Sequence, residues 1–273
     1  MIRAKTPSRR RGPWPWALAG ALLGALLALA ALAPASWVAR WVAAQTGQRL
    51  LLVDARGTLW SGSAVAVLAG GPGSREASAL PGRLHWRLGR GGAPAAFELA
   101  LRQDCCIDDA LRVLARPGIG RLRVAVGSPE PARAHWPAAW LAGLGAPFNT
   151  LRLGGRVQLQ TDGLALEWVQ GRLRVTGQAE LRLQDLSSRL STLPVLGSYR
   201  LVLSGAGDGP EGARVALQTL QGPLRLSGQG QWAGATLRFR GQAEAEPGSE
   251  AMLNNLLNLL GQRQGPLALL AIG

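Results

Sequence analysis

The sequence predicts a mainly β protein, in which a single N-terminal transmembrane helix is followed by an antiparallel, meander-type β domain with a few short helices. Two observations support this prediction. From about residue 50 onward, apolar and polar residues alternate with a period of two, the pattern of half-buried strands. Before that point, no charged residue lies between Arg11 and Arg40. Short connections rich in glycine and proline favour antiparallel neighbours among the strands.

The uncharged N-terminal segment has the length of a membrane span. A bilayer core needs roughly 20 apolar residues in a helix, and residues 17–33 are an unbroken run of alanine, leucine and glycine. The five basic residues before this run favour a cytoplasmic N-terminus. We therefore expect a cytoplasmic basic segment at residues 1–12, a single-pass inner-membrane anchor at 13–39 and a periplasmic β-rich domain at 40–273. A weaker sub-boundary is expected near residues 145–148.

A cleaved signal peptide is the alternative interpretation, because Ala33, Pro34 and Ala35 resemble a small-residue cleavage site. The apolar run is longer than the roughly 7–15 residues of a signal core, and a proline inside the cleavage tripeptide is unfavourable. An uncleaved anchor is therefore favoured. Whether the segment is an anchor or a signal peptide, the rest of the chain is expected to be exported from the cytoplasm.

The charge balance narrows the classes of partner. Five of the 30 basic residues precede Gly12, so the remainder carries 25 basic against 16 acidic residues, a net charge of +9. A basic surface suits an acidic partner, anionic lipid or nucleic acid, and export argues against nucleic acid. Lys5 is the only lysine, and most of the arginines are expected on solvated strand faces.

The first part of the exported region is predicted to hold short strands and one or two helical turns. A turn is expected at residues 54–57, and a loop at 70–74. Pro137 suits the first turn of a helix, and an acidic first turn favours a helix start at 106–114. The predicted strands are 51–53, 58–67, 84–88, 97–101 and 122–126, and the predicted short helix is 137–144.

The second part alternates more regularly. Asp162-Gly163 is a strong hairpin signal between two alternating segments. Ser249 can cap a helix that ends at Gly261. The predicted strands are 151–161, 164–168, 173–183, 199–203, 215–219, 224–228, 237–241 and 267–272, with turns at 205–209, 221–223 and 233–234.

The sequence offers few groups for catalysis. His85 and His135 each adjoin a tryptophan and form no metal-binding pair. Ser61 lacks the spacing of a nucleophile elbow. The acidic cluster of Asp104, Asp108 and Asp109 is interpreted as a loop and helix start rather than a glycosidase or metal site. We predict no enzyme activity, no catalytic, cofactor-binding or metal site, and no cofactor.

Cys105 and Cys106 are the only cysteines, and they are adjacent. An exported location permits a bond between them, which would close a strained ring. Such bonds are labile, so a redox role remains open beside the simpler interpretation of two thiols at a strand end. The sequence does not decide whether they are bonded.

Five motifs follow one another along the chain. They are Gly57-Thr-Leu-Trp-Ser-Gly62, His135-Trp-Pro-Ala-Ala-Trp-Leu141, Leu193-Pro-Val-Leu-Gly-Ser-Tyr-Arg200, Leu224-Arg-Leu-Ser-Gly-Gln-Gly-Gln-Trp232 and Leu256-Leu-Asn-Leu-Leu-Gly-Gln-Arg263. Together they resemble the bacterial type II secretion system protein N family. The resemblance implies a non-enzymatic accessory component of the inner-membrane platform that exports folded proteins across the outer membrane, with other inner-membrane subunits as partners. The family supplies no catalytic residues to transfer.

The alternative function is lipid handling in a β-sheet groove, which would resemble AsmA-like envelope proteins. Four tryptophans expected on apolar strand faces favour a closed core instead. Residues 51–53 and 267–272 are the expected sheet edges, where a partner strand could add. The four tryptophans are Trp60, Trp86, Trp168 and Trp232.

Overall fold

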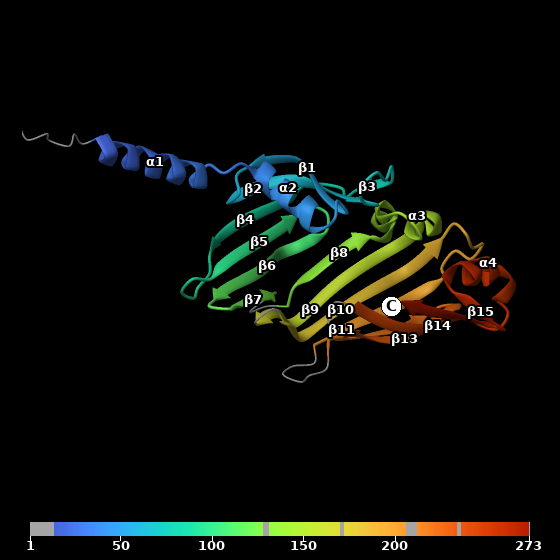
Figure 1. Cartoon of the computed structure of the whole chain (residues 1–273). Helices are drawn as coiled ribbons and strands as arrows, with labels where there is room; N and C mark the ends of the chain where they lie inside the picture. The colour runs from blue at the N-terminus through green and yellow to red at the C-terminus, as the bar shows by residue number, and fades with distance from the viewer. Residues whose placement is uncertain (1–13, 128–130, 170–171, 206–211, 234–235, 273) are drawn as a thin grey trace, which may run out of the picture.

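The computed structural model describes residues 14–127, 131–169, 172–205, 212–233 and 236–272 (Figure 1). These form one 16-stranded sheet in which every strand pair is antiparallel. The strand order is β1-β2-β4-β5-β6-β7-β9-β10-β11-β12-β13-β14-β16-β15, with β3 beside β2 and β8 beside β9. The prediction of a mainly β, antiparallel fold with a few short helices is confirmed.

Two helices precede the sheet. Helix α1 (Trp14–Ala31) projects away from it, and α2 (Ala35–Gln45) packs against β1 (Leu50–Gly57) (Figure 1). The indole nitrogen of Trp60 donates a hydrogen bond to the carbonyl of Ala30 (2.9 Å), which fixes the end of α1 to the sheet. Within the described ranges, no helix combines the length and apolarity needed to cross a membrane. The predicted transmembrane helix is therefore not confirmed.

The first seven strands form the half of the sheet next to α2. They are β1, β2 (Ser61–Ala69), β3 (Ala77–Ala79), β4 (Leu84–Arg90), β5 (Phe97–Gln103), β6 (Ile107–Gly118) and β7 (Arg121–Val126). The predicted strands at 84–88, 97–101 and 122–126 are confirmed, and so is the loop at 70–74.

Two local predictions in this half are wrong. The turn expected at 54–57 lies instead at 58–60, because β1 continues through a bulge at Asp54 (φ 51°) to pair up to Gly57. The helix start expected at 106–114 is strand β6, since Leu111 and Val113 pair with Leu101 and Leu99 of β5. Cross-strand burial of these alternating residues outweighs the local preference of acidic residues for a helix start.

In the middle of the chain, a short strand and two short helices precede two long strands. Strand β8 (Arg133–Pro137) leads into a 3₁₀ helix, η1 (Ala138–Leu144), which confirms a short helix after Pro137, and α3 (Phe148–Leu151) follows. Strands β9 (Leu153–Val169) and β10 (Arg172–Ser188) each have 17 residues. The sheet continues across residues 145–148, because β7 pairs directly with β9.

The hairpin predicted at Asp162-Gly163 is wrong, because β9 runs straight through these residues. Gly163 (φ 57°) lies at a bulge opposite Gly177 (φ 76°), where the register with β10 shifts by one residue. A Cβ added to Gly177 would approach the Gly163 carbonyl oxygen to 2.1 Å, so no side chain fits there. Left-handed glycine suits a bulge as well as a turn. The actual connection, at 170–171, lies outside the described residues.

The remaining predicted strands are confirmed as β11 (Gly197–Ser204), β12 (Arg214–Gln221), β13 (Leu224–Ala233), β14 (Thr236–Ala245) and β16 (Leu267–Ile272). Helix α4 (Glu250–Leu260) matches the predicted 249–261 helix, although the Ser249 side chain makes no capping hydrogen bond. The turn at 221–223 joins β12 to β13. The turns predicted at 205–209 and 233–234 fall largely outside the described residues.

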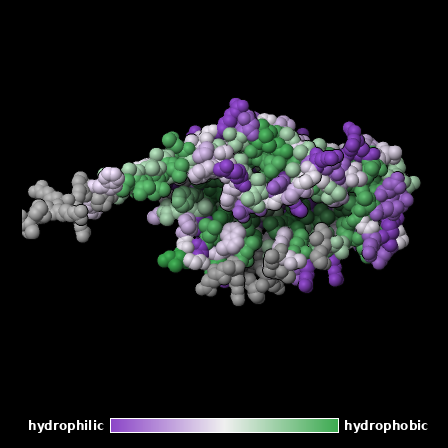
Figure 2. Space-filling model, turned by 45° about the horizontal axis from the view of Figure 1, so that its top comes forward, coloured by the Kyte–Doolittle hydropathy of each residue, from purple (hydrophilic) through white to green (hydrophobic). Residues whose placement is uncertain are grey.

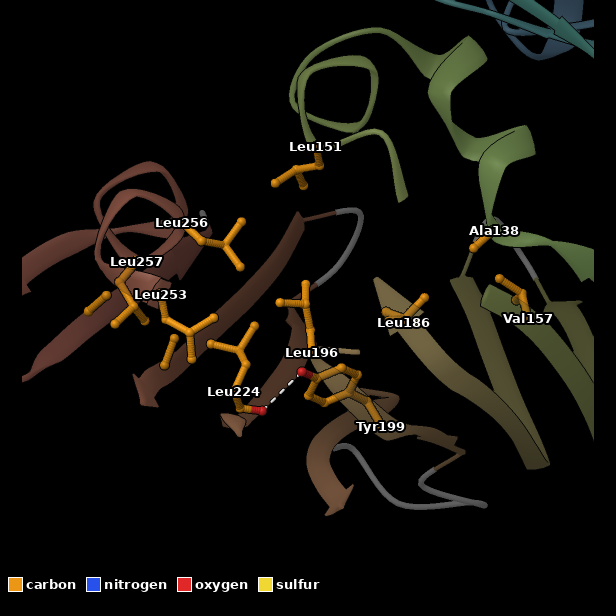
Figure 3. Packing of buried hydrophobic residues seen from close by; sticks show 12 residues of the cluster. Ala138, Leu151, Val157, Leu186, Leu196, Tyr199, Leu224, Leu253, Leu256 and Leu257 are labelled. Atoms are coloured by element: carbon orange, nitrogen blue, oxygen red, sulfur yellow. Dashed lines mark hydrogen bonds between the residues drawn. The ribbon is translucent and has the colours of Figure 1, made fainter. Parts of the chain in front are cut away.

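The main core lies where α4, η1 and α3 cover one end of the sheet. Leu253, Leu256 and Leu257 of α4 point toward Leu224 and its neighbours (Figure 3). Tyr199 is 1% exposed, and its hydroxyl donates a hydrogen bond to the Leu224 carbonyl (2.9 Å). Burial raises the pKa of this phenol, so the hydroxyl stays protonated and available as a donor.

The two expected sheet edges differ in outcome. Strand β1 is an edge, as predicted. Strand β16 is not the last strand, because β15 (Gln262–Gln264) pairs with residues 267–269 on its outer side. Its residue Ala268 is fully buried in the core beneath α4. The C-terminal segment is therefore an internal part of the fold over much of its length.

Candidate interaction surfaces

One face of the sheet is apolar from β4 to β16. Cross-strand register links Leu99 to Val113 and, beyond the bulge, Leu181 to Leu201 and Leu217 on the same side. Because the bulge adds one residue to β9, it keeps the apolar positions of both halves on one face. Figure 2 shows hydrophobic side chains within the shaded hollow near the middle of the molecule and hydrophilic ones around its margin.

Helices cover parts of this apolar face: α4, η1 and α3 pack over one end, and α2 packs against Ala64 and Trp86 of β2 and β4. At the end opposite α4, Leu122, Trp168 and Leu173 pair in one row across β7, β9 and β10. Their exposed fractions are 39%, 37% and 51%, respectively. Three large apolar side chains in register at a sheet end form a contiguous exposed patch, which makes this end a candidate contact site. We call these three residues the apolar row.

The tryptophans only partly match the closed-core interpretation. Trp86 is 5% exposed, and its indole nitrogen donates to the carbonyls of Thr58 and Leu59 at 3.2 Å. Trp60 lies in the β1–β2 turn rather than on a strand face and is 39% exposed. Trp232 is half-buried, and Trp168 belongs to the apolar row. Only Trp86 fills a core as expected.

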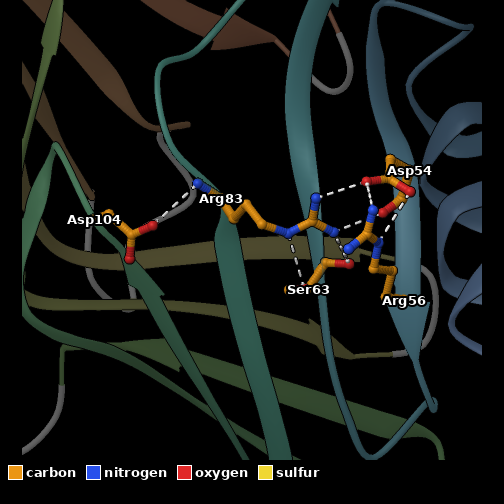
Figure 4. A network of polar contacts seen from close by, with 5 residues as sticks. All are labelled: Asp54, Arg56, Ser63, Arg83 and Asp104. Carbon is orange, nitrogen blue, oxygen red and sulfur yellow. Dashed lines mark hydrogen bonds and ion pairs between the residues drawn. The ribbon is translucent and has the colours of Figure 1, made fainter.

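The β1 edge carries a polar network that the sequence analysis missed. Arg83 reaches from its place just before β4 to the Asp54 carboxylate (2.8 Å) and carbonyl (2.7 Å), and its Nε donates to Ser63 (Figure 4). Hydrogen bonds from Arg83 and Arg56 hold the pKa of Asp54 below its ordinary value. The Asp104 carboxylate accepts from the backbone N–H of Arg83. The network ties the bulged edge to the next strands.

A second network lies on the polar face of the central strands. Burial raises the pKa of Glu180, but hydrogen bonds from Arg200 (2.6 Å) and Arg182 outweigh this and leave the pKa below its ordinary value. The three residues come from adjacent strands or alternate positions of one strand. Glu180 is thus ionised and pairs with both arginines, which leaves the group of three with one net positive charge.

The residues considered for chemistry do not converge on one site. His85 lies 3.7 Å from Asp104, and both side chains are at least half exposed. His135 is on β8 and Ser61 begins β2. The side chain of Asp108 lies outside the described part of the structure. Across the described ranges, no group of three or more His, Cys, Asp or Glu residues is placed to hold a metal ion.

The adjacent cysteines form a disulfide at the β5–β6 turn. Cys106 is 3% exposed and packs with Ala66 and Leu80. The backbone N–H of His135 donates to the Cys106 carbonyl (2.8 Å), so the turn is held against β8. The pair therefore occupies a packed junction between the two halves of the sheet.

The wide sheet, with one apolar face and one arginine-rich polar face, presents two surfaces of different chemistry. The family model for type II secretion system (T2SS), protein N, matches residues 48–269. The chain belongs to this family, which confirms the resemblance seen in its motifs and associates it with protein transport by type II secretion. No curated protein and no solved structure matches it.

Proposed function

We propose that this chain is a non-enzymatic accessory component of the type II secretion system, and that its β sheet is a periplasmic contact domain of the inner-membrane platform. Its partners would be other inner-membrane subunits. The observation that carries this proposal is the family match over residues 48–269. The breadth of the sheet, with its two chemically different faces, supports a role in contact rather than in turnover.

The proposal includes a single-pass attachment, with the N-terminus in the cytoplasm. The five basic residues before Gly12 and the uncharged sequence of α1 support it. A reporter active only outside the cytoplasm, fused after residue 273, should be active. Activity of a cytoplasmic reporter at the same position would refute this topology. Leu26→Arg should raise the free energy of insertion by about 2.5–3.5 kcal/mol.

The partner contact needs a test that leaves the fold intact. Deleting residues 267–273 would remove the fully buried Ala268, so it would damage the core as well as any contact. A clean in-frame deletion of the whole gene, complemented by the full chain, avoids this problem. We expect secretion to fall without the chain and the purified chain to recover other secretion subunits in mild detergent. Unchanged secretion together with no recovered subunit would refute the proposal.

Edge pairing at β1 is a poor route for that contact. The Thr46 hydroxyl, at the end of α2, accepts a hydrogen bond from the Leu50 N–H (3.1 Å), so this edge donor is already occupied. Further along, the bulge at Asp54 and its ion pairs with Arg56 and Arg83 interrupt the strand. Bulges and charges of this kind protect an edge from another strand. Contact through a face is therefore favoured.

Lipid handling is the second candidate, and the apolar row is the observation that favours it. Lipid extraction followed by mass spectrometry of the detergent-purified chain should then detect bound phospholipid. Replacing Trp168 and Leu173 with glutamine should lower the bound amount. The matched control is Leu220→Gln, because Leu220 is 50% exposed among the polar positions of β12. Equal lipid in all three proteins, or none in the wild type, would eliminate this candidate.

A further inference from the structure

The polar face of the sheet is hollowed over the C-terminal strands. The hollow has a volume of about 970 Å³ and lies over β12, β13 and β14. Small residues, among them Ala216 and Ser204, form part of its lining, and Arg214, Arg238 and Arg240 are its charged members. Two further hollows, of about 530 and 500 Å³, continue along the same strands. Glutamine and Ser227 contribute to both linings, and the second hollow, farthest from Arg238, also has Arg225, Glu244 and Glu246 in its lining. Together they form a polar trough.

Two of the arginines in this hollow have no ionic partner among the described residues. Arg238 and Arg240 form no ion pair there, and no carboxylate is among the described residues that line the hollow. Other arginines on this face behave differently. Arg182 and Arg200 flank Glu180, and Arg225 pairs with Glu246 at 2.6 Å. Arg238 and Arg240 thus give the hollow positive charge that no carboxylate in the described ranges offsets.

Strand geometry sets the spacing of these cations. Arg238 and Arg240 are two residues apart on β14, so their Cα atoms lie about 7 Å apart on one face. Arg214 and Arg238 both stand opposite Gln231, so they are separated by two strand spacings, about 10 Å. The separation of Arg238 and Arg240 is below the Debye length of about 8 Å at physiological ionic strength, so the potentials of these two arginines add.

We propose that this hollow binds an extended acidic segment of a partner protein, with carboxylates at alternate positions. Alternate residues of an extended peptide are about 7 Å apart, which matches the spacing of Arg238 and Arg240. Guanidinium groups form strong, charge-assisted hydrogen bonds with carboxylates. The glutamines of the adjoining trough, such as Gln229 and Gln242, can donate to and accept from a peptide backbone.

A protein segment fits this site better than a membrane lipid. Arginine and glutamine are interspersed in its walls with apolar residues such as Val202 and Ala216, so charged groups lie along the hollow where acyl chains would need a continuous apolar channel. It also lies over strands at the far end of the sheet from α1 (Figure 1). The inference deepens the proposed function and rests on it, because it assigns a partner chemistry to one surface of the contact domain.

The test uses the detergent-purified full chain and a labelled peptide in which glutamate alternates with threonine. Fluorescence anisotropy should detect binding that weakens as salt is raised. Arg238→Gln with Arg240→Gln should weaken affinity on the order of tenfold. Ala216→Phe should weaken it as well, because it fills the hollow without changing the charge. The matched charge control is Arg121→Gln with Arg123→Gln on the exposed strand β7, which should bind like the wild type.

Several results would overturn the inference. Equal losses in the β14 and β7 variants would show that only net charge matters. Equal binding of a peptide with glutamine in place of glutamate would also contradict it, as would competition by glycerol phosphate at the same concentration as the peptide. If the β14 variant recovers secretion subunits as well as the wild type does, the site is not the contact, and the proposed function stands. If even the wild type recovers none and secretion is unaffected by deletion, the proposed function itself fails.

Discussion

Helix α4 should stabilise the fold only through the side chains that it buries against the sheet. Two leucines of this helix, one buried and one exposed, test this expectation. Leu256 is 1% exposed within the main core, whereas Leu259, three residues later, is 47% exposed. Truncating a fully buried leucine to alanine loses the transfer free energy of the removed carbons and leaves a cavity. The two effects together cost about 2–5 kcal/mol. Alanine is a slightly better helix former than leucine, so helix propensity does not add to the loss.

We therefore expect Leu256→Ala to lower the free energy of unfolding by about 3 kcal/mol and Leu259→Ala to change it by less than about 1 kcal/mol. Urea titration of the detergent-purified chain, followed by far-ultraviolet circular dichroism, measures both. The slope of the transition should stay the same, so that the difference appears in the midpoint. Similar midpoints for the two variants would mean that α4 does not pack on the sheet as described, and the reasoning would fail.

The other predictions concern buried polar groups and the disulfide. Tyr199→Phe should destabilise the chain by about 1–2 kcal/mol in the same titration, because the Leu224 carbonyl loses its buried donor; no change would contradict this. The lowered pKa of Glu180 contributes stability above the unfolded pKa of about 4.3, and this is lost as the pH falls through the folded pKa. The stability advantage of the wild type over Glu180→Gln should therefore shrink between pH 6 and pH 3, and a constant difference would refute the assignment. Replacing Cys105 and Cys106 with serine should leave protein level and secretion unchanged, since a bond between neighbours closes almost no loop. Loss of secretion at a normal protein level would indicate a redox role.

The strands were predictable because their signal is local and repeated. Alternation over six or more residues identifies a half-buried strand whatever its neighbours are, and β10 to β14 follow it closely. Errors arose where one short motif suits two structures. Asp162-Gly163 can form a hairpin turn or a bulge, and only its pairing with Gly177 selects the bulge.

The contact surfaces were less predictable, because they depend on register between distant residues. Arg83 and Asp54 are 29 positions apart, and only the pairing of β1, β2 and β4 brings them together. In the same way, Arg214 and Arg238 share one hollow only because both stand opposite Gln231. A sequence pattern shows which residues share a face of one strand, but it does not show which strands are adjacent.

The protection of the sheet edges has a consequence for assembly. Thr46 and the bulge at Asp54 occupy one edge, and β15, a three-residue strand whose residues are all exposed, ends the other. Short or bulged edges oppose the addition of a further strand. A partner must then be recognised by side chains on a face. Contacts at the arginine hollow should weaken as salt is raised, whereas contacts at the apolar row should persist in salt and be lost in detergent. The salt and detergent dependence of subunit recovery therefore distinguishes the two faces without any substitution.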